Sequence, residues 1–284
     1  MRDQVVIVTG ASSGIGKASA SGIAALGAHV VLVSRTESRG RRALDDIARA
    51  VPAASLDLLV ADLSTIDAIT ALAHEFKRKY SRLDVLFNNA GLITNRRRVT
   101  PDGLELQFMV NYLAYYLLTG MLLDTLHASR PARIINMTSS SHSSGVINFD
   151  DLQLERHYRG WQAYANTKLM SMVYTYELAR RLEGSGITAN CLHPGVIRTG
   201  LMRNFSSVLH VAWTALGRFF KQPDDGAATP VYLASSPEVE GVTGTYFRYC
   251  RPFGTTEASH DPDVQRRLWE ASERLSGYRY QFPA

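Results

Sequence analysis

The sequence is poor in cysteine, with two in 284 residues, Cys191 and Cys250. They lie far apart, so neither a disulfide framework nor a cysteine-rich metal site is predicted. The opening residues show no basic segment, long hydrophobic segment and cleavage site of the kind that make up a secretory signal. Both observations favour a reducing compartment, and we expect a cytoplasmic protein that holds no metal.

Long hydrophobic runs are also missing. One uncharged stretch, residues 106–123, contains Gln107, Asn111, Thr119 and Gly120. We therefore expect it to form buried helix and predict no transmembrane span. Hydrophobic residues make up 45% of the chain and charged residues 20%, which excludes extensive disorder.

The sequence has only a small excess of positive charge. Lys and Arg number 31 against 26 Asp and Glu, for a net charge of +5. This balance is compatible with nucleic acid, an anionic membrane surface or a phosphorylated ligand. No basic stripe with interleaved aromatic residues is present, so nucleic acid is not predicted as a partner.

Short β-branched runs alternate with amphipathic segments along most of the chain. Strands are expected at residues 5–8, 28–33, 56–60, 85–87, 133–137, 188–192 and 242–248. Helices are expected between them, for example at 15–26, 41–50, 66–80 and 161–182. This alternation predicts an α/β fold: a Rossmann-like, doubly wound parallel sheet of about seven strands with helices on both faces. We expect one domain over residues 1–284, with a peripheral C-terminal extension at about 251–284 that is helical around 264–275.

A glycine-rich turn follows the first expected strand and precedes a helix. Gly10 allows a tight turn, Gly14 lets the backbone approach a pyrophosphate, and Gly16 permits close packing of helix on strand. The helix N-terminus would offer free N–H groups to phosphates. A plain turn is the alternative. The candidate cofactor-binding residues here are Gly10, Ser12, Ser13, Gly14, Ile15 and Gly16.

Arg35 follows the second expected strand, where an NAD site would carry an acidic residue. A guanidinium suits the dianionic 2′-phosphate of NADP and has no comparable partner in NAD. We therefore predict NADP(H) as the cofactor. The alternative is a solvated helix face, which we expect for the nearby Arg41 and Arg42.

Tyr164 and Lys168 stand four residues apart in an expected helix and share one face of it. A nearby ammonium lowers the pKa of a phenol and suits it for proton transfer. Taken alone the spacing is common and usually structural, but its place after the fifth expected strand favours a catalytic role.

The sequence contains further motifs, which are, in order along the chain, Asp62-Leu63, Asn88-Asn89-Ala90-Gly91, Asn111, Ser139 and Pro194-Gly195. With the glycine-rich turn and Tyr164/Lys168, the chain resembles the short-chain dehydrogenase/reductase family over residues 5 to about 200. The segments 136–142, 177–182, 192–196, 244–247 and 268–269 are similar to those of its retinol-dehydrogenase-like subgroup.

The resemblance implies a catalytic role for Asn111, Ser139, Tyr164 and Lys168. Tyr164 would donate a proton to the carbonyl oxygen as hydride arrives, and Ser139 would hydrogen-bond the developing oxyanion. Lys168 would lower the pKa of Tyr164 and hold the nicotinamide ribose, while Asn111 would fix a water for proton resupply. The neighbouring alternatives to Ser139 are Thr138, Ser140 and Ser141.

The resemblance also implies further contacts to the cofactor. Asp62 and Leu63 would lie near the adenine, although Asp62 could instead be a helix N-cap. Pro194 to Thr199 would pass the nicotinamide. The remaining cofactor-binding candidates are Asn89, Ala90, Gly91, Pro194, Gly195, Val196 and Thr199.

Two segments would shape a substrate pocket: residues 140–161, with His142, Tyr158 and Trp161, and a lid at about 200–222, rich in apolar and aromatic residues. A lipophilic small-molecule carbonyl or alcohol is the expected substrate. The leading hypothesis is NADPH-dependent reduction of a lipophilic ketone or aldehyde. The alternatives are a retinol- or steroid-type alcohol dehydrogenase working oxidatively, and a non-catalytic NADP-binding sensor or scaffold. The family also suggests a homodimer through the helices beginning near Gly103 and Trp161.

Overall fold

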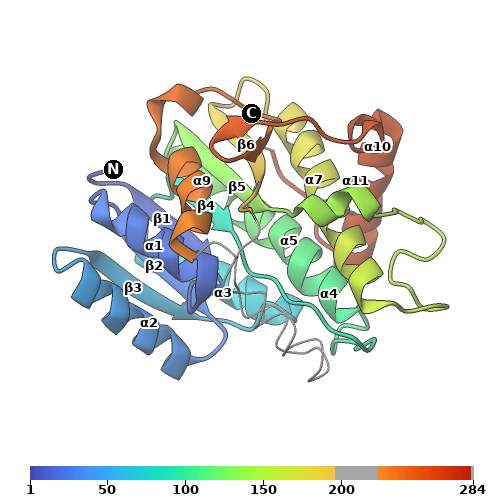
Figure 1. The fold of residues 1–284 in the computed structure, drawn as a ribbon, viewed down its shortest axis with the longest axis horizontal. Coiled ribbons are helices and arrows are strands. Elements are labelled where there is room, and N and C mark those ends of the chain that lie inside the picture. The colour runs from blue at the N-terminus through green and yellow to red at the C-terminus, as the bar shows by residue number, and fades with distance from the viewer. Residues whose placement is uncertain (196–222, 283–284) are drawn as a thin grey trace.

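The computed structural model describes residues 1–195 and 223–282, and the strands within them form one sheet (Figure 1). The strand order is β3-β2-β1-β4-β5-β6-β7-β8. The strands are β1 (Val5–Thr9), β2 (His29–Ser34), β3 (Ser55–Val60), β4 (Val85–Asn88), β5 (Ala132–Met137), β6 (Ile187–His193), β7 (Tyr246–Arg248) and β8 (Arg251–Pro252). The pairs from β3 to β7 are all parallel, which confirms the predicted doubly wound Rossmann-like sheet.

The last strand pair differs from the prediction of about seven parallel strands. β8 pairs antiparallel with β7, with Arg248 opposite Arg251. Tyr249 and Cys250 form the two-residue connection and both have positive φ, of 53° and 58°. Such a backbone matches the twist of a tight hairpin. No Asn-Gly or Asp-Gly pair marks this turn, so the sequence did not predict it.

Helices cover both faces of the sheet (Figure 1). One hydrophobic cluster packs α1 (Gly14–Ala25), α2 (Glu37–Ala50) and α9 (Pro223–Ser235) against it. A second cluster packs α3 (Ile66–Lys79), α5 (Ala114–Met121) and α7 (Gly160–Arg181) on the other face. The shorter elements are α4 (Leu106–Phe108), η1 (Met109–Leu113), α6 (Leu123–Ala128), η2 (Ser140–Ser144), η5 (Pro237–Val239) and α10 (Glu257–His260).

The uncharged stretch at 106–123 is buried helix, as expected, and spans α4, η1 and α5. η1 is a π-helical turn that includes Asn111, and such turns often occur at functional sites. Within the described part of the chain, no helix is long and apolar enough to cross a membrane.

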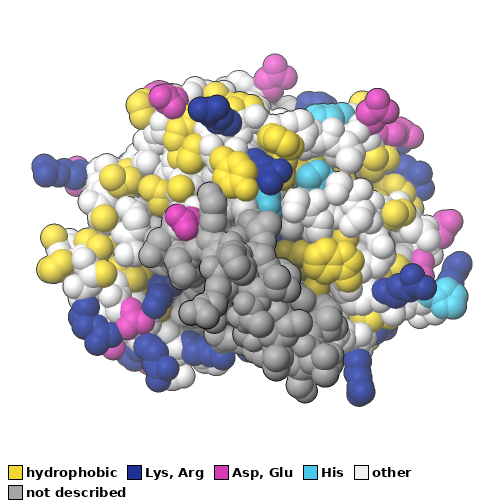
Figure 2. Space-filling view, in the orientation of Figure 1, with side chains coloured by type: hydrophobic (Ala, Val, Ile, Leu, Met, Phe, Trp, Pro, Cys, Tyr) yellow, Lys and Arg dark blue, Asp and Glu magenta, His cyan; other side chains and the backbone are white. Residues whose placement is uncertain are grey.

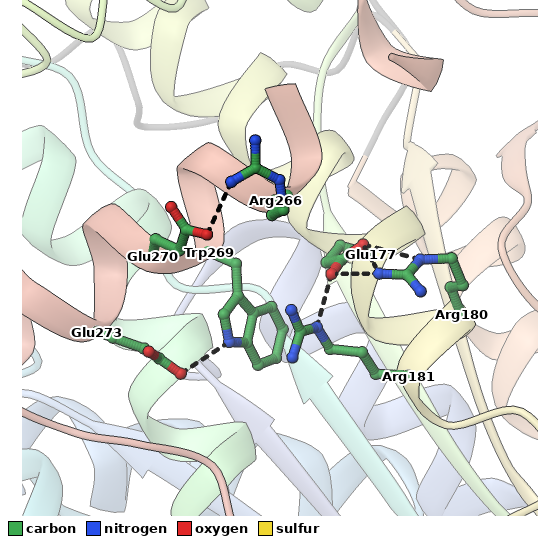
Figure 3. Close-up of polar contacts among 7 residues, drawn as sticks. All are labelled: Glu177, Arg180, Arg181, Arg266, Trp269, Glu270 and Glu273. Carbon is green, nitrogen blue, oxygen red and sulfur yellow. Dashed lines mark hydrogen bonds and ion pairs between the residues drawn. The ribbon is translucent and has the colours of Figure 1, made fainter. Parts of the chain in front are cut away.

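The C-terminal extension is not peripheral, contrary to expectation. Its helix α11 (Pro262–Ser276) begins at the N-cap Asp261 and buries Leu268 and Trp269 in the core cluster of α7. The buried carboxylate of Glu177 on α7 accepts hydrogen bonds from Arg180 and Arg181 (Figure 3). The Arg181 guanidinium lies 4.2 Å from the centroid of the Trp269 ring, so α11 is an integral part of this layer.

Residues after α11 cover α5. The Tyr280 hydroxyl donates to the Tyr116 carbonyl oxygen at 2.6 Å and lies 2.7 Å from the Tyr174 hydroxyl. Gly120 makes room for this segment, because a Cβ there would lie 2.5 Å from the Tyr278 ring and 2.6 Å from the Tyr280 ring. The chain's own C-terminal segment therefore covers part of the helix surface through which a homodimer was expected to form. The homodimer stays a prediction.

This aromatic contact predicts a measurable effect on stability. Tyr280→Ala is expected to lower the free energy of unfolding by about 3 kcal/mol, because it leaves a cavity beside Tyr116 and Trp269. The matched change Tyr280→Phe keeps the ring and removes the two hydroxyl contacts, so a loss of about 1 kcal/mol is expected. Urea denaturation measures both values, and equal losses would contradict the cavity explanation.

Candidate functional site

The glycine-rich turn has the backbone that the sequence predicted. Gly10 and Gly14 have φ of +66° and +55°. A Cβ on Gly16 would lie 2.6 Å from the Gly10 carbonyl oxygen, and one on Gly10 would lie 2.8 Å from the Ala90 Cα. Ser13 is the N-cap of α1 but its side chain makes no capping hydrogen bond. A side chain at Gly10 or Gly16 would clash with the loop after β4 or with the turn itself, so glycine is needed at both positions for this close packing.

The turn is fastened to the end of β4 by Thr9, a residue that the sequence analysis did not single out. Its hydroxyl oxygen accepts hydrogen bonds from the backbone N–H groups of Asn89 (2.9 Å) and Ala90 (3.0 Å). The Asn89 side-chain amide donates to the Thr9 carbonyl oxygen at 2.7 Å. These bonds hold Asn89, Ala90 and Gly91 beside the glycine-rich turn. A threonine at a strand end gives no signal of this role in sequence.

Arg35 lies one residue beyond β2, at the same edge of the sheet as the glycine-rich turn. It is exposed and makes no ion pair or hydrogen bond with any described residue. Arg41 instead pairs with Glu37 at 2.6 Å, as a solvated helix residue does. Arg and Lys side chains gather over α2 in Figure 2. The free guanidinium of Arg35 is therefore available to an anionic ligand.

Asp62 and Leu63 follow β3, the neighbour of β2. Asp62 is exposed, and its carboxylate accepts a hydrogen bond from the Ser64 N–H at 3.1 Å. It is not the N-cap of α3, since Thr65 holds that position and accepts from the Ala68 N–H. Leu63 is buried in the core. The helix-cap alternative for Asp62 is thus wrong, while its contact with an adenine stays a prediction.

The four residues of the predicted catalytic set lie at the carboxyl ends of the strands. The Lys168 ammonium nitrogen is 5.7 Å from the centroid of the Tyr164 ring, one helical turn away on α7. Gly91, in the loop that follows β4, lies close to two of these side chains. A Cβ placed on it would be 3.4 Å from the Asn111 side-chain oxygen and 3.7 Å from the Lys168 nitrogen. Segments from β4, η1 and α7 therefore converge here.

Asn111 links the β4 loop to α7. Its side-chain oxygen accepts from the Leu92 N–H at 2.8 Å, and its amide donates to the Leu92 carbonyl oxygen at 2.9 Å. The same amide is 3.2 Å from the Thr167 hydroxyl, which donates to the Tyr164 carbonyl oxygen. Asn111 thus holds the loop against the tyrosine-bearing helix, and its role toward a water molecule stays a prediction.

Burial governs the electrostatics of the pair on α7. The Lys168 side chain is buried and donates to the Met137 carbonyl oxygen at 2.9 Å, and burial lowers its pKa to about 7. Burial also raises the pKa of Tyr164 to about 12, against a smaller lowering effect from a hydrogen bond with Ser139. The expected lowering of the tyrosine pKa by Lys168 is therefore not found in the protein alone. Burial removes water from both side chains and disfavours the charged form of each. For Tyr164 this desolvation outweighs any stabilisation of the phenolate by its neighbours.

The structure distinguishes among the four hydroxyls at the end of β5. The Thr138 hydroxyl is buried and donates to the Leu192 carbonyl oxygen at 2.8 Å. Ser140 is exposed, and the Ser141 hydroxyl is buried with no hydrogen-bond partner in the described part of the chain. The Ser139 hydroxyl is the one of the four that lies near enough to Tyr164 to lower the pKa of its phenol. The geometry supports Ser139 as the member of the set.

The end of β6 continues into Pro194 and Gly195, which has φ of 92°. Val196, Thr199 and the predicted lid at about 200–222 lie outside the described residues. His193 precedes Pro194 and is buried, and neither ring nitrogen has a hydrogen-bond partner among the described residues. Burial, with the nearby Arg248 and His142, lowers the pKa of His193 to about 4.

The three aromatic candidates of the substrate region have different places. Trp161 is 53% exposed and its ring centroid is 5.8 Å from that of Tyr164, so it lies beside the predicted reacting group. Tyr158 donates to Glu105 at 2.9 Å and is also bonded to Gln107, so its hydroxyl ties the loop to α4. His142 is buried, and its ring Nδ1 lies 2.7 Å from the Ser139 carbonyl oxygen.

The described residues also place a short basic segment and the two cysteines. Three arginines follow one another at positions 96–98. The middle one, Arg97, donates to the Gln153 carbonyl oxygen at 3.3 Å and so ties two loops together. Cys191 and Cys250 are both free thiols. In residues 1–195 and 223–282, no group of three or more His, Cys, Asp and Glu side chains is placed to hold a metal ion.

Comparison with known proteins gives one consistent family. A family model for short chain dehydrogenase matches residues 4–209. Human retinol dehydrogenase 14 is 40% identical, over 98% of this chain and 87% of that protein. Human polyprenol dehydrogenase is 36% identical, over 97% of this chain and 86% of that protein.

Solved structures give the same result. A Mycobacterium paratuberculosis protein matches with a TM-score of 0.80 at 29% identity, over 100% of this chain and 96% of that one. An Escherichia coli short chain dehydrogenase complexed with NADPH matches with a TM-score of 0.71 at 26% identity, over 88% of this chain and 98% of that one.

Proposed function

The chain belongs to the short-chain dehydrogenase family and is retinol-dehydrogenase-like, and from that premise we propose that it reduces a lipophilic ketone or aldehyde with NADPH. The observation that carries this proposal is the convergence of Asn111 and Lys168 at Gly91, with Tyr164 beside Lys168 and Ser139 near enough to lower the pKa of Tyr164. A non-catalytic sensor has no need of such a set.

The residues present fit a phosphorylated dinucleotide. The glycine-rich turn has positive φ at Gly10 and Gly14 and leads into the N-terminus of α1, and Arg35 is free of partners among the described residues. Gly10 to Gly16 would hold the pyrophosphate, and Arg35 the 2′-phosphate. Support for NADP over NAD also comes from the relative solved with NADPH.

In the proposed reaction, bound NADPH supplies a hydride to the carbonyl carbon. The Tyr164 hydroxyl donates its proton to the carbonyl oxygen, which becomes the alcohol. The Ser139 hydroxyl donates a hydrogen bond to the same oxygen as its negative charge develops. Lys168, held by the Met137 carbonyl oxygen, keeps a cation close to Tyr164 and steadies the phenolate that proton donation leaves. Its lowered pKa, about 7, suits it to return a proton near neutral pH.

A lipophilic substrate is supported by two observations. The relatives are named for retinol and polyprenol, both of them long apolar alcohols. The exposed indole of Trp161 lies beside Tyr164, where an apolar substrate would bury it.

The test is consumption of NADPH, followed at its absorbance, with all-trans-retinal, a steroid ketone and an aromatic polyketide ketone. We expect turnover with at least one of them and about tenfold or greater preference over a small hydrophilic carbonyl such as pyruvate. No turnover with any apolar carbonyl would contradict the proposal. The relatives' names are those of dehydrogenases, so the same apparatus run with NADP⁺ and the matching alcohols tests the oxidative alternative.

A further inference from the structure

His142 makes two hydrogen bonds to one atom of Ser139. Its backbone N–H donates to the Ser139 carbonyl oxygen at 3.1 Å, and its ring Nδ1 lies 2.7 Å from the same oxygen. A carbonyl oxygen only accepts, so Nδ1 carries the proton and the ring is the donor. The Ser139 peptide group is thus fixed by a side chain as well as by the backbone of η2.

The imidazole is itself held in place. It is 7% exposed and meets the Tyr246 ring edge-on, with centroids 5.2 Å apart and an interplanar angle of 71°. Burial lowers the pKa of His142, against the hydrogen bond to Ser139, which raises it. Burial thus disfavours the charged ring, and the contact with the Ser139 carbonyl oxygen places a proton on Nδ1.

Ser139 needs this support because its side chain is short and its hydroxyl rotates. The hydroxyl oxygen accepts a hydrogen bond from the Ser141 N–H at 3.3 Å, which leaves the hydroxyl hydrogen to be donated elsewhere. The same hydroxyl lies near enough to the Tyr164 phenol to lower its pKa. A donor that stabilises a developing oxyanion works best when its orientation is set before the reaction.

We infer that His142 is a positioning residue, which holds the Ser139 backbone through Nδ1 so that the Ser139 hydroxyl points at the reacting carbonyl oxygen beside Tyr164. The inference rests on the proposed function, because only the proposed reaction requires the Ser139 hydroxyl to hydrogen-bond the carbonyl oxygen of a substrate. His142 itself touches neither the reacting atoms nor, in this arrangement, any other hydrogen-bond acceptor at Nδ1. Its effect belongs on kcat, with little change in KM or in the affinity for NADPH.

The test uses two amide substitutions with the best apolar carbonyl from the substrate panel. In His142→Asn the amide nitrogen takes the position of Nδ1 and can still donate to Ser139. In His142→Gln it takes the position of Nε2 and cannot. We expect His142→Asn to keep kcat within about threefold of the wild type and His142→Gln to lose about tenfold, with KM nearly unchanged. NADPH binding by fluorescence and thermal melting check that both variants are folded.

A double-mutant cycle with Ser139→Ala then separates this inference from the proposed function. If His142 acts through Ser139, His142→Gln should cost less than twofold in the Ser139→Ala background. Additive losses, equal losses in the Asn and Gln variants, or no loss in either would overturn the inference. An unaltered kcat in Ser139→Ala alone would instead overturn the role proposed for Ser139.

Discussion

Replacing Tyr164 with phenylalanine is expected to lower kcat about 10³-fold while NADPH still binds. The change removes one oxygen atom from a buried ring, so the fold and the cofactor cradle at Gly10 to Gly16 are left intact. What is lost is the proton that the phenol gives to the carbonyl oxygen. Steady-state kinetics with the apolar carbonyl and fluorescence titration with NADPH measure the two parts separately.

Tyr158→Phe is the matched control for this experiment. It removes the same atom from a tyrosine whose hydroxyl is bonded to Glu105, Gln107 and Thr94, away from Lys168. This variant is expected to melt at a lower temperature and to keep its kcat, because its hydroxyl serves the loop and not the reaction. Full turnover in Tyr164→Phe, or an equal loss in both variants, would contradict the mechanism.

Replacing Arg35 with alanine is expected to raise KM for NADPH by about 10- to 100-fold and to leave KM for NADH nearly unchanged. The 2′-phosphate is the only difference between the two cofactors, and Arg35 is the unpaired guanidinium directly after β2. Kinetics with each cofactor at saturating carbonyl gives the ratio. The preference should also weaken as salt is added, because the side chain is exposed.

Arg41→Ala serves as the control for Arg35. Arg41 lies on α2 and is exposed, as Arg35 is, but its guanidinium is paired with Glu37. We expect its removal to change KM for NADPH less than threefold. A wild-type protein that prefers NADH at equal concentration, or an Arg35→Ala variant with unchanged KM for NADPH, would show that the cofactor assignment is wrong.

Much of the site could be predicted because its residues carry local signals. Gly10, Gly14 and Gly16 mark a backbone that other residues do not readily adopt, and the structure has that backbone. Tyr164 and Lys168 share a helix face because four residues make one turn, and the distance between them follows from that spacing. The apolar strands predicted the parallel sheet, because both of its faces are covered.

Other parts depended on contacts between segments distant in sequence, which no local pattern records. Thr9 holds the end of β4 across about 80 residues, and His142 could be placed behind Ser139 only once η2 was folded against β7. The same holds for Tyr158, which looks like a pocket residue in sequence and is bonded to Glu105.

The small excess of positive charge did not by itself identify a partner, and the few cysteines only excluded sites. By itself the sequence determined the fold class, the glycine-rich turn and the Tyr164/Lys168 pair, because each follows from backbone geometry or helical spacing. The tertiary structure alone decided that the Thr138 hydroxyl is bonded to Leu192, that α11 and Tyr280 cover α5 and α7, and that burial sets the pKa values of Tyr164 and Lys168. Those outcomes depend on desolvation and on packing across the chain, and both are properties of the folded molecule.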